Sequence, residues 1–132
     1  MPHVVLLGDS IFDNAAYVPG KPDVIAQLRH ALPNGWRATL CAVDGSLLTD
    51  VSEQFASVPK DATHLVISAG GNDALGHLGL LSESAASVAE VLERLSAASA
   101  GFERDYGQML TRVLERGLPV AVCTVYYPRF PD

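Results

Sequence analysis

The chain has 132 residues, 48% hydrophobic and 18% charged, which suits one compact domain and excludes a disordered or fibrous chain. No apolar run approaches the roughly 20 residues needed to cross a bilayer, and the first strand begins too near Met1 to leave room for a signal peptide, so we expect a cytoplasmic protein. A net charge of −6 with scattered arginines disfavours nucleic acid as a partner and fits small neutral substrates better.

The first predicted strand is the apolar run of residues 4–7, which is too short for a helix and rich in strand formers. Gly8, Asp9 and Ser10 follow where this strand ends. In open α/β sheets, ligands bind at the carboxyl ends of the strands, so Ser10 is the first candidate for chemistry. An ordinary polar turn explains the same three residues, because each of them favours turns for local reasons.

Helical and strand patterns alternate along the rest of the chain. In chain order we expect a helix over residues 22–32, a strand over 36–43, a short helix over 48–58, a strand over 63–69, a long helical segment over 82–117 and a strand over 119–125. Ser87 and Glu90 have the spacing of a capping box within the long segment. Gly101, near its middle, predicts a break or kink.

This alternation predicts an α/β fold: a three-layer α/β/α sandwich around a flavodoxin-like parallel sheet of order 2-1-3-4. The second strand ends in the turn 44–46 and the third in the turn 70–73, so all three turns would meet at one edge of the sheet. In that order Cys41 and Cys123 lie roughly 14 Å apart, too far for a disulfide. Neither cysteine has metal-ligand spacing to another, and we expect no metal and no other cofactor.

The three turns together carry a resemblance to a known family. Gly8-Asp9-Ser10 followed by Ile11, then Gly45, then Gly70-Gly71-Asn72-Asp73 are similar to the first three sequence blocks of SGNH hydrolases of the GDSL esterase and lipase group. Isoleucine stands at position 11 where that group usually has leucine. The match spans residues 1–132, and it identifies the chain as resembling a single SGNH-hydrolase domain.

The resemblance implies a serine esterase or lipase that acts on small esters. Ser10 would be the nucleophile, and the oxyanion hole would consist of the backbone N–H groups of Ser10 and Gly45 and the side-chain amide of Asn72. Asp9 and Asp73 would support these turns through hydrogen bonds rather than react. Further apolar and aromatic residues would line the substrate pocket: Ile11, Phe12, Leu75, Leu78, Tyr126 and Tyr127.

One part of the family pattern has no counterpart among these blocks. In SGNH hydrolases the catalytic base comes from an Asp-x-x-His motif after a fifth strand, and the patterns in this chain predict four strands. The only such motif, Asp61 to His64, is expected at the amino edge of the sheet, ~17 Å from Ser10. His77 is the other local candidate. We therefore expect that the domain is incomplete at its C-terminus and that this chain alone is inactive. Expression of a longer product of the coding sequence would test this.

An incomplete sheet would leave the fourth strand as an open edge, which invites homodimer formation. Because the base is missing, a second hypothesis remains: the chain is a nonenzymatic SGNH-like binding module or a truncated interaction protein. Nucleotide-binding folds are disfavoured because the sequence has neither GxxxxGK[ST] nor GxGxxG. An α/β-hydrolase would need GxSxG, which is also absent.

Overall fold

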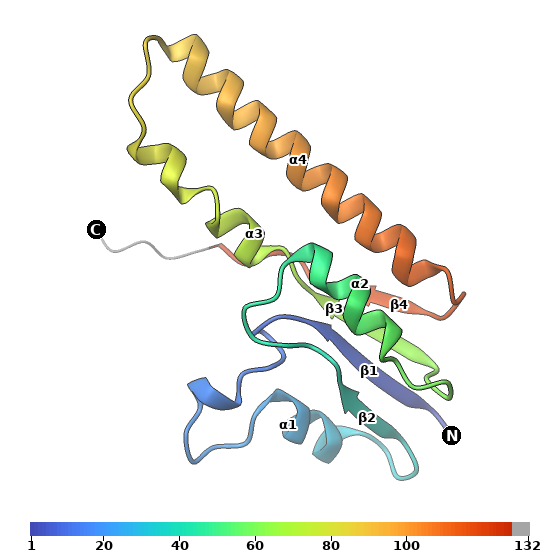
Figure 1. Ribbon diagram of the computed structural model, residues 1–132. Helices are drawn as coiled ribbons and strands as arrows, with labels where there is room; N and C mark the ends of the chain where they lie inside the picture. The colour runs from blue at the N-terminus through green and yellow to red at the C-terminus, as the bar shows by residue number, and fades with distance from the viewer. Residues whose placement is uncertain (128–132) are drawn as a thin grey trace.

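A computed structural model describes residues 1–127 and contains a parallel four-stranded sheet of order β2-β1-β3-β4 (Figure 1). The strands are β1 (His3–Gly8), β2 (Arg37–Leu40), β3 (His64–Ser68) and β4 (Val120–Val122). β1 lies at the centre, where His3 pairs with Arg37 of β2 and Gly8 pairs with Ser68 of β3. The predicted strand order is confirmed, and each of the other three strands is shorter than expected from its apolar run.

Helices cover both faces of the sheet, as the three-layer prediction requires. α1 (Val24–Ala31) packs its Ile25 against Val4 and Leu6 of β1. α2 (Leu48–Ala56) and α4 (Val88–Leu114) pack on the opposite face. They cover Val5 and Leu7 of β1 and the side chains of β3 that point to the same face. Successive residues of β1 therefore point into different cores, and this explains why the strand is continuously apolar.

The long helix differs from its prediction at two points. α4 runs without interruption through Gly101, so the predicted break is wrong. A single glycine costs a helix about 1 kcal/mol, which the packing of this helix against α2 and the sheet offsets. The helix also begins later than residue 82, at the predicted capping box, where Ser87 Oγ accepts a hydrogen bond from the Glu90 N–H at 3.2 Å.

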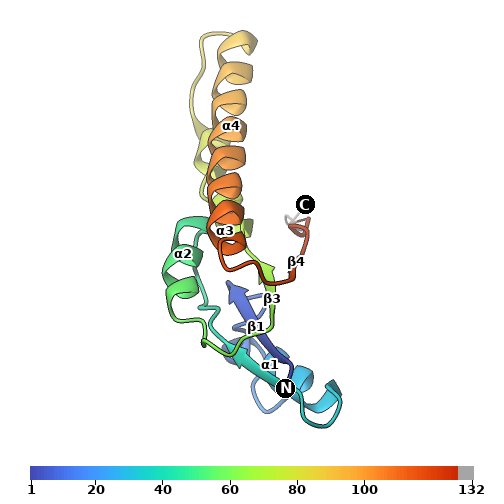
Figure 2. The same ribbon diagram turned by 90° about the vertical axis from the view of Figure 1, so that its right-hand side faces the viewer.

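Three short helices were not predicted: η1 (Ala15–Tyr17), α3 (Gly71–Leu75) and η2 (Leu78–Ser82). α3 and η2 link the end of β3 to the start of α4. Figure 2 shows that this link and the N-terminal half of α4 project together beyond the sheet. We call this projection, residues 77–101, the arm.

Both cysteines are free and half-buried, and burial raises the pKa of the Cys41 thiol. Among the helices of residues 1–127, none combines the length and the apolar character needed to cross a membrane. β4 forms one edge of the described sheet, and self-association through it stays a prediction.

Candidate active site

The first turn of the site follows β1 directly. Gly8 has a φ of 130°, and a Cβ at this position would lie 1.8 Å from the backbone oxygen of Ser68, so only glycine fits. The Asp9 N–H donates to the same Ser68 oxygen at 3.1 Å, and the Asp9 carboxylate accepts from the Ile11 N–H at 3.1 Å. Burial raises the pKa of Asp9. These bonds hold Ser10, which is half-buried, at the carboxyl end of the central strand.

The second turn contains Gly45, whose φ of 82° is a left-handed conformation that favours glycine. No atom lies within 4 Å of the place a Cβ would occupy, so the backbone of this turn stays open to an approaching molecule. Asp13 ties the turn to the first one, because its carboxylate accepts from the Asp44 N–H at 2.8 Å.

Gln54 of α2 joins the first and second turns from beneath. Its side chain is buried, and its Nε2 donates to the Gly8 oxygen at 2.8 Å and to Ser46 Oγ at 3.0 Å. Its Oε1 accepts from the Gly8 N–H at 2.8 Å. Gln54 was not among the residues predicted from the sequence to form the site. The available signal was a polar side chain three residues after Val51 and four before Val58, on the face of the helix that is otherwise apolar.

The third turn begins at Gly70, which has a φ of 109°, and leads into α3. The side-chain Nδ2 of Asn72 donates to the backbone oxygen of Ser46 at 3.0 Å. Asp73 Oδ2 accepts from the Leu48 N–H at 2.9 Å and so caps the start of α2. Burial is the main cause that raises the pKa of Asp73, and the bond from Leu48 opposes it.

The predicted turns therefore meet at the carboxyl edge of the sheet. Hydrogen bonds connect the first turn to the second through Gln54, and the second to the third through Asn72. The assignment of roles to Ser10, Gly45 and Asn72 stays a prediction.

The residues predicted to line a pocket lie in different surroundings. Ile11 and Tyr126 are exposed, and Tyr126 lies so close to the third turn that a Cβ on Gly71 would be 2.9 Å from its ring. Leu75 is half-buried in α3. Phe12, in contrast, is buried in the core beside α1, so we remove it from the residues proposed to meet a substrate. Leu78 and Tyr127 are exposed.

The Asp61 to His64 motif lies at the amino edge, as predicted. His64 opposes Val4 in the register and stacks on Trp36, with ring centroids 5.7 Å apart. Four residues of strand, about 13 Å, separate its level from that of Gly8. Asp61 binds Arg37 and the buried His3, whose Nε2 lies 2.8 Å from Thr39 Oγ1. This cluster joins the first residues of three strands and is remote from Ser10.

His77 lies near the third turn but on the side that faces α4. It is exposed, and it borders a groove of about 450 Å³ between α3 and the middle of α4. Asn72 and Asp73 border the same groove from α3, and Arg104 and Asp105 border it from α4. His30 is exposed in the last turn of α1.

Comparisons with known proteins match no family model and no curated protein. Solved structures do match. They include an extracellular lipase from Streptomyces rimosus, with 20% identity over 92% of this chain and a TM-score of 0.59, and TesA, with 18% identity over 96% and a TM-score of 0.64. Phospholipase A1 from Streptomyces albidoflavus has 23% identity over 99% of this chain and a TM-score of 0.60.

These likenesses confirm the predicted α/β fold, which the chain shares with the lipase, TesA and the phospholipase A1. The chain spans 58%, 62% and 61% of the lengths of these three structures.

Proposed function

We propose that this chain is the nucleophile-bearing part of a serine hydrolase that cleaves small esters. Ser10 Oγ gives its proton to a base and attacks the ester carbonyl, whose oxygen becomes an oxyanion. Collapse of this intermediate breaks the bond to the alcohol, which leaves with the proton from the base, and water then hydrolyses the acyl-serine. The backbone N–H groups of Ser10 and Gly45 and the amide of Asn72 donate to the oxyanion. Donors held in place before the reaction stabilise the developing charge without a cost of reorganisation, which is the largest single contribution in many enzymes.

The observation that supports this proposal is the chain of hydrogen bonds that runs from Gly8 through Gln54 and Ser46 to Asn72. It fixes the positions of the three turns relative to one another. The Nδ2 of Asn72 carries two hydrogens, and its bond to Ser46 uses one of them. The second hydrogen is available to an oxyanion.

A serine hydroxyl also needs a base, which must itself be oriented. Among residues 1–127, His3 and His64 form their hydrogen bonds at the opposite edge of the sheet. His77 borders the same groove as Asn72, but within the described residues no hydrogen bond joins its ring to Ser10 or to an orienting carboxylate. We place the base and its carboxylate partner in a segment that the present sequence does not include. The greater length of the compared structures supports this placement.

The substrate class follows from the surroundings of Ser10 and from the comparisons. Ile11 is exposed next to the serine, and the ring of Tyr126 lies against the third turn. Two of the compared structures are described as a lipase and a phospholipase A1, and both names denote esterases of lipids. An ester with an apolar acyl group fits these features.

The test is ester hydrolysis by the product of the complete reading frame, with short-chain p-nitrophenyl esters as substrates. Ser10→Ala is expected to lower kcat by at least about 10³-fold, because nucleophile and base act as a unit. Ser57→Ala is the matched control, since Ser57 is exposed at the far end of α2. The 132-residue chain alone is expected to lack activity.

The alternative is a binding module with the same fold, favoured by the remote positions of His3 and His64. If the longer product cleaves esters equally well with alanine at position 10, the serine mechanism is wrong. If the reading frame ends at Asp132, the binding module becomes the better account.

A further inference from the structure

Apolar and aromatic residues at heptad spacing form one stripe along the length of α4. They recur at alternating intervals of four and three residues, with Ser99 at the one polar position: Val88, Leu92, Leu95, Ser99, Phe102, Tyr106, Met109 and Val113. This heptad spacing keeps all of these side chains on one face of the helix. It is the spacing of a seam that packs against another element.

Among the described residues, only the C-terminal half of the stripe packs into the core cluster of the sheet. Met109 and Val113 are 2% and 0% exposed, and Phe102 and Tyr106 pack against the same core cluster. In the N-terminal half, Val88, Leu92 and Leu95 are 75%, 60% and 44% exposed. We call these three residues the seam. Figure 2 shows why they are uncovered: this half of the helix lies beyond the sheet.

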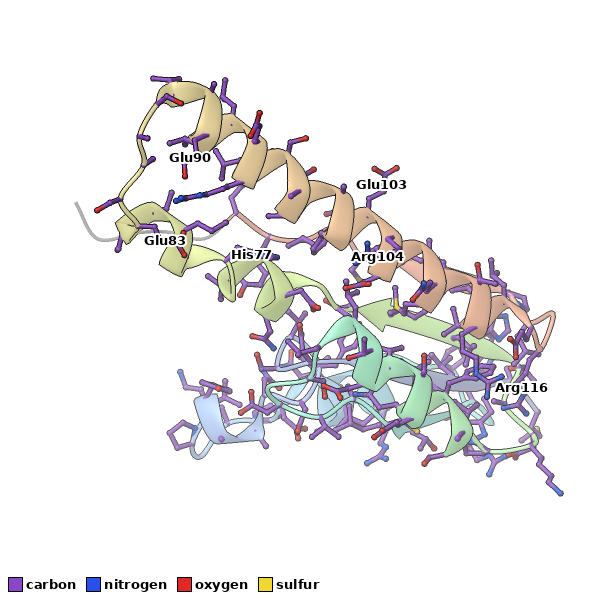
Figure 3. All side chains as sticks on the ribbon, turned by 45° about the horizontal axis from the view of Figure 1, so that its top comes forward. His77, Glu83, Glu90, Glu103, Arg104 and Arg116 are labelled. Atoms are coloured by element: carbon purple, nitrogen blue, oxygen red, sulfur yellow. The ribbon has the colours of Figure 1, made fainter. Side chains whose placement is uncertain are left out.

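The neighbouring segment η2 covers a different side of the helix. Leu80 and Leu81 of η2 and Val91, Arg94 and Leu95 of α4 line a small hollow of about 150 Å³. Figure 3 shows Glu83 and Glu90 on the two facing segments at the outer end of the arm, and the guanidinium of Arg94 donates to both carboxylates. These bonds fix η2 along one flank, where it reaches the edge of the seam at Leu95, and Val88 and Leu92 lie outside the hollow.

We propose that the seam is the docking surface for an amphipathic helix from a part of the polypeptide that the present sequence does not include. The exposed seam continues the register of the buried half, so the same kind of packing is expected along both. The three compared structures have further chain with no counterpart in this sequence, because this chain spans 58–62% of their lengths. A helix of about 14 residues, or ~21 Å, would cover the arm from Val88 to Gly101.

The path of the described chain brings it to the foot of the arm. After β4, Val125 lies beside Gly70 and Tyr126 lies against Gly71, at the start of α3. The arm extends from that same place, as Figure 1 shows.

The charges of the arm indicate the chemistry of the docking helix. The arm carries Glu83, Glu90 and Glu93, and its one arginine, Arg94, is already paired with two of them. Glu103 is exposed one turn after Ser99 and points away from η2 in Figure 3. The partner is therefore expected to present an apolar stripe flanked by lysine or arginine.

Cysteine accessibility in the product of the complete reading frame tests this proposal without any measurement of catalysis. In a background with Cys41→Ala and Cys123→Ala, Leu92→Cys is compared with Ala97→Cys, which is exposed and about 140° away around the helix. We expect Leu92→Cys to react with a maleimide at least about tenfold more slowly than Ala97→Cys. Equal rates would overturn the proposal.

Amide hydrogen exchange of the unaltered longer product gives a second measurement that does not depend on folding of the variants. Residues 88–100 are expected to be protected as strongly as residues 102–113, and exchange at least about a hundredfold faster would contradict the proposal.

Three other outcomes would also overturn it. They are a reading frame that ends at Asp132, protection that disappears on dilution and so reports a second copy, and protection that needs phosphatidylcholine vesicles. The proposal shares with the proposed function only the premise that the polypeptide continues. A protected seam in a product without esterase activity would separate the two.

Discussion

The side chain of Gln54 forms two hydrogen bonds with the backbone of Gly8, one to its N–H and one to its oxygen, each at 2.8 Å. A glutamine amide has one acceptor and two donors, and a central strand offers one backbone donor and one acceptor at its last residue. The third bond of Gln54, to Ser46, extends the connection to the second turn. A side chain on a helix thus sets the spacing between two turns that lie far apart in the sequence.

Replacement of Gln54 by alanine is expected to weaken both the fold and the site. It leaves the buried Gly8 N–H without its glutamine partner, at a cost of about 1–3 kcal/mol, whereas the Gly8 oxygen still accepts from the Val43 N–H at 3.1 Å. The free energy of unfolding, measured by urea denaturation, should fall by at least about 1 kcal/mol. Gln27→Ala is the control, because Gln27 is exposed on α1, and it should change stability by less than about 0.5 kcal/mol. Equal effects of the two substitutions would contradict the role of Gln54.

Asn72→Ala tests the proposed oxyanion hole in the longer product. Loss of one such donor typically lowers kcat by about 10²–10³-fold, and KM should change much less because the donor acts on the transition state. Asn34→Ala, in the exposed turn after α1, should leave both parameters unchanged. A rise in KM with unchanged kcat would show instead that Asn72 binds the ground state.

The alternation of strand and helix periodicities predicted a parallel sheet with right-handed crossovers, and the order 2-1-3-4, taken from flavodoxin-like sheets, is the order in the structure. The same patterns predicted that turns 8–10, 44–46 and 70–73 lie at one edge. The position of Gln54 could not be predicted in the same way. A buried glutamine has no local partner, and its three bonds depend on how α2 sits over β1. The continuity of α4 through Gly101 depends likewise on tertiary packing, which local propensity does not contain.

Gly8→Ala is expected to lower the free energy of unfolding severely, and Gly107→Ala is expected to raise it. A methyl group at position 8 would lie 1.8 Å from a backbone oxygen, and the φ of 130° is strained for alanine. Gly107, in contrast, lies in α4 with no other atom within 4 Å of the place for a Cβ. Alanine there should raise the free energy of unfolding by up to about 1 kcal/mol. Thermal and urea denaturation of both variants would test this, and a well-folded Gly8→Ala protein would contradict the geometry of the first turn.

The raised pKa of Asp73 predicts how the stability of this region depends on pH. Burial disfavours its ionised form more than the bond from the Leu48 N–H favours it, so the folded state holds the proton more tightly than the unfolded state does. The folded state therefore gains stability from this group as the pH falls below the raised pKa, and bears a cost when the pH is above it.

Asp73→Asn keeps an oxygen that can accept from Leu48 and removes the charge. At pH 7 the variant should be at least as stable as the wild type in urea, and the difference should shrink as the pH is lowered toward 4. If Asp73→Asn were less stable than the wild type at pH 7 and equally stable at pH 4, the ionised carboxylate would stabilise the folded state, and its pKa would be lowered by folding rather than raised.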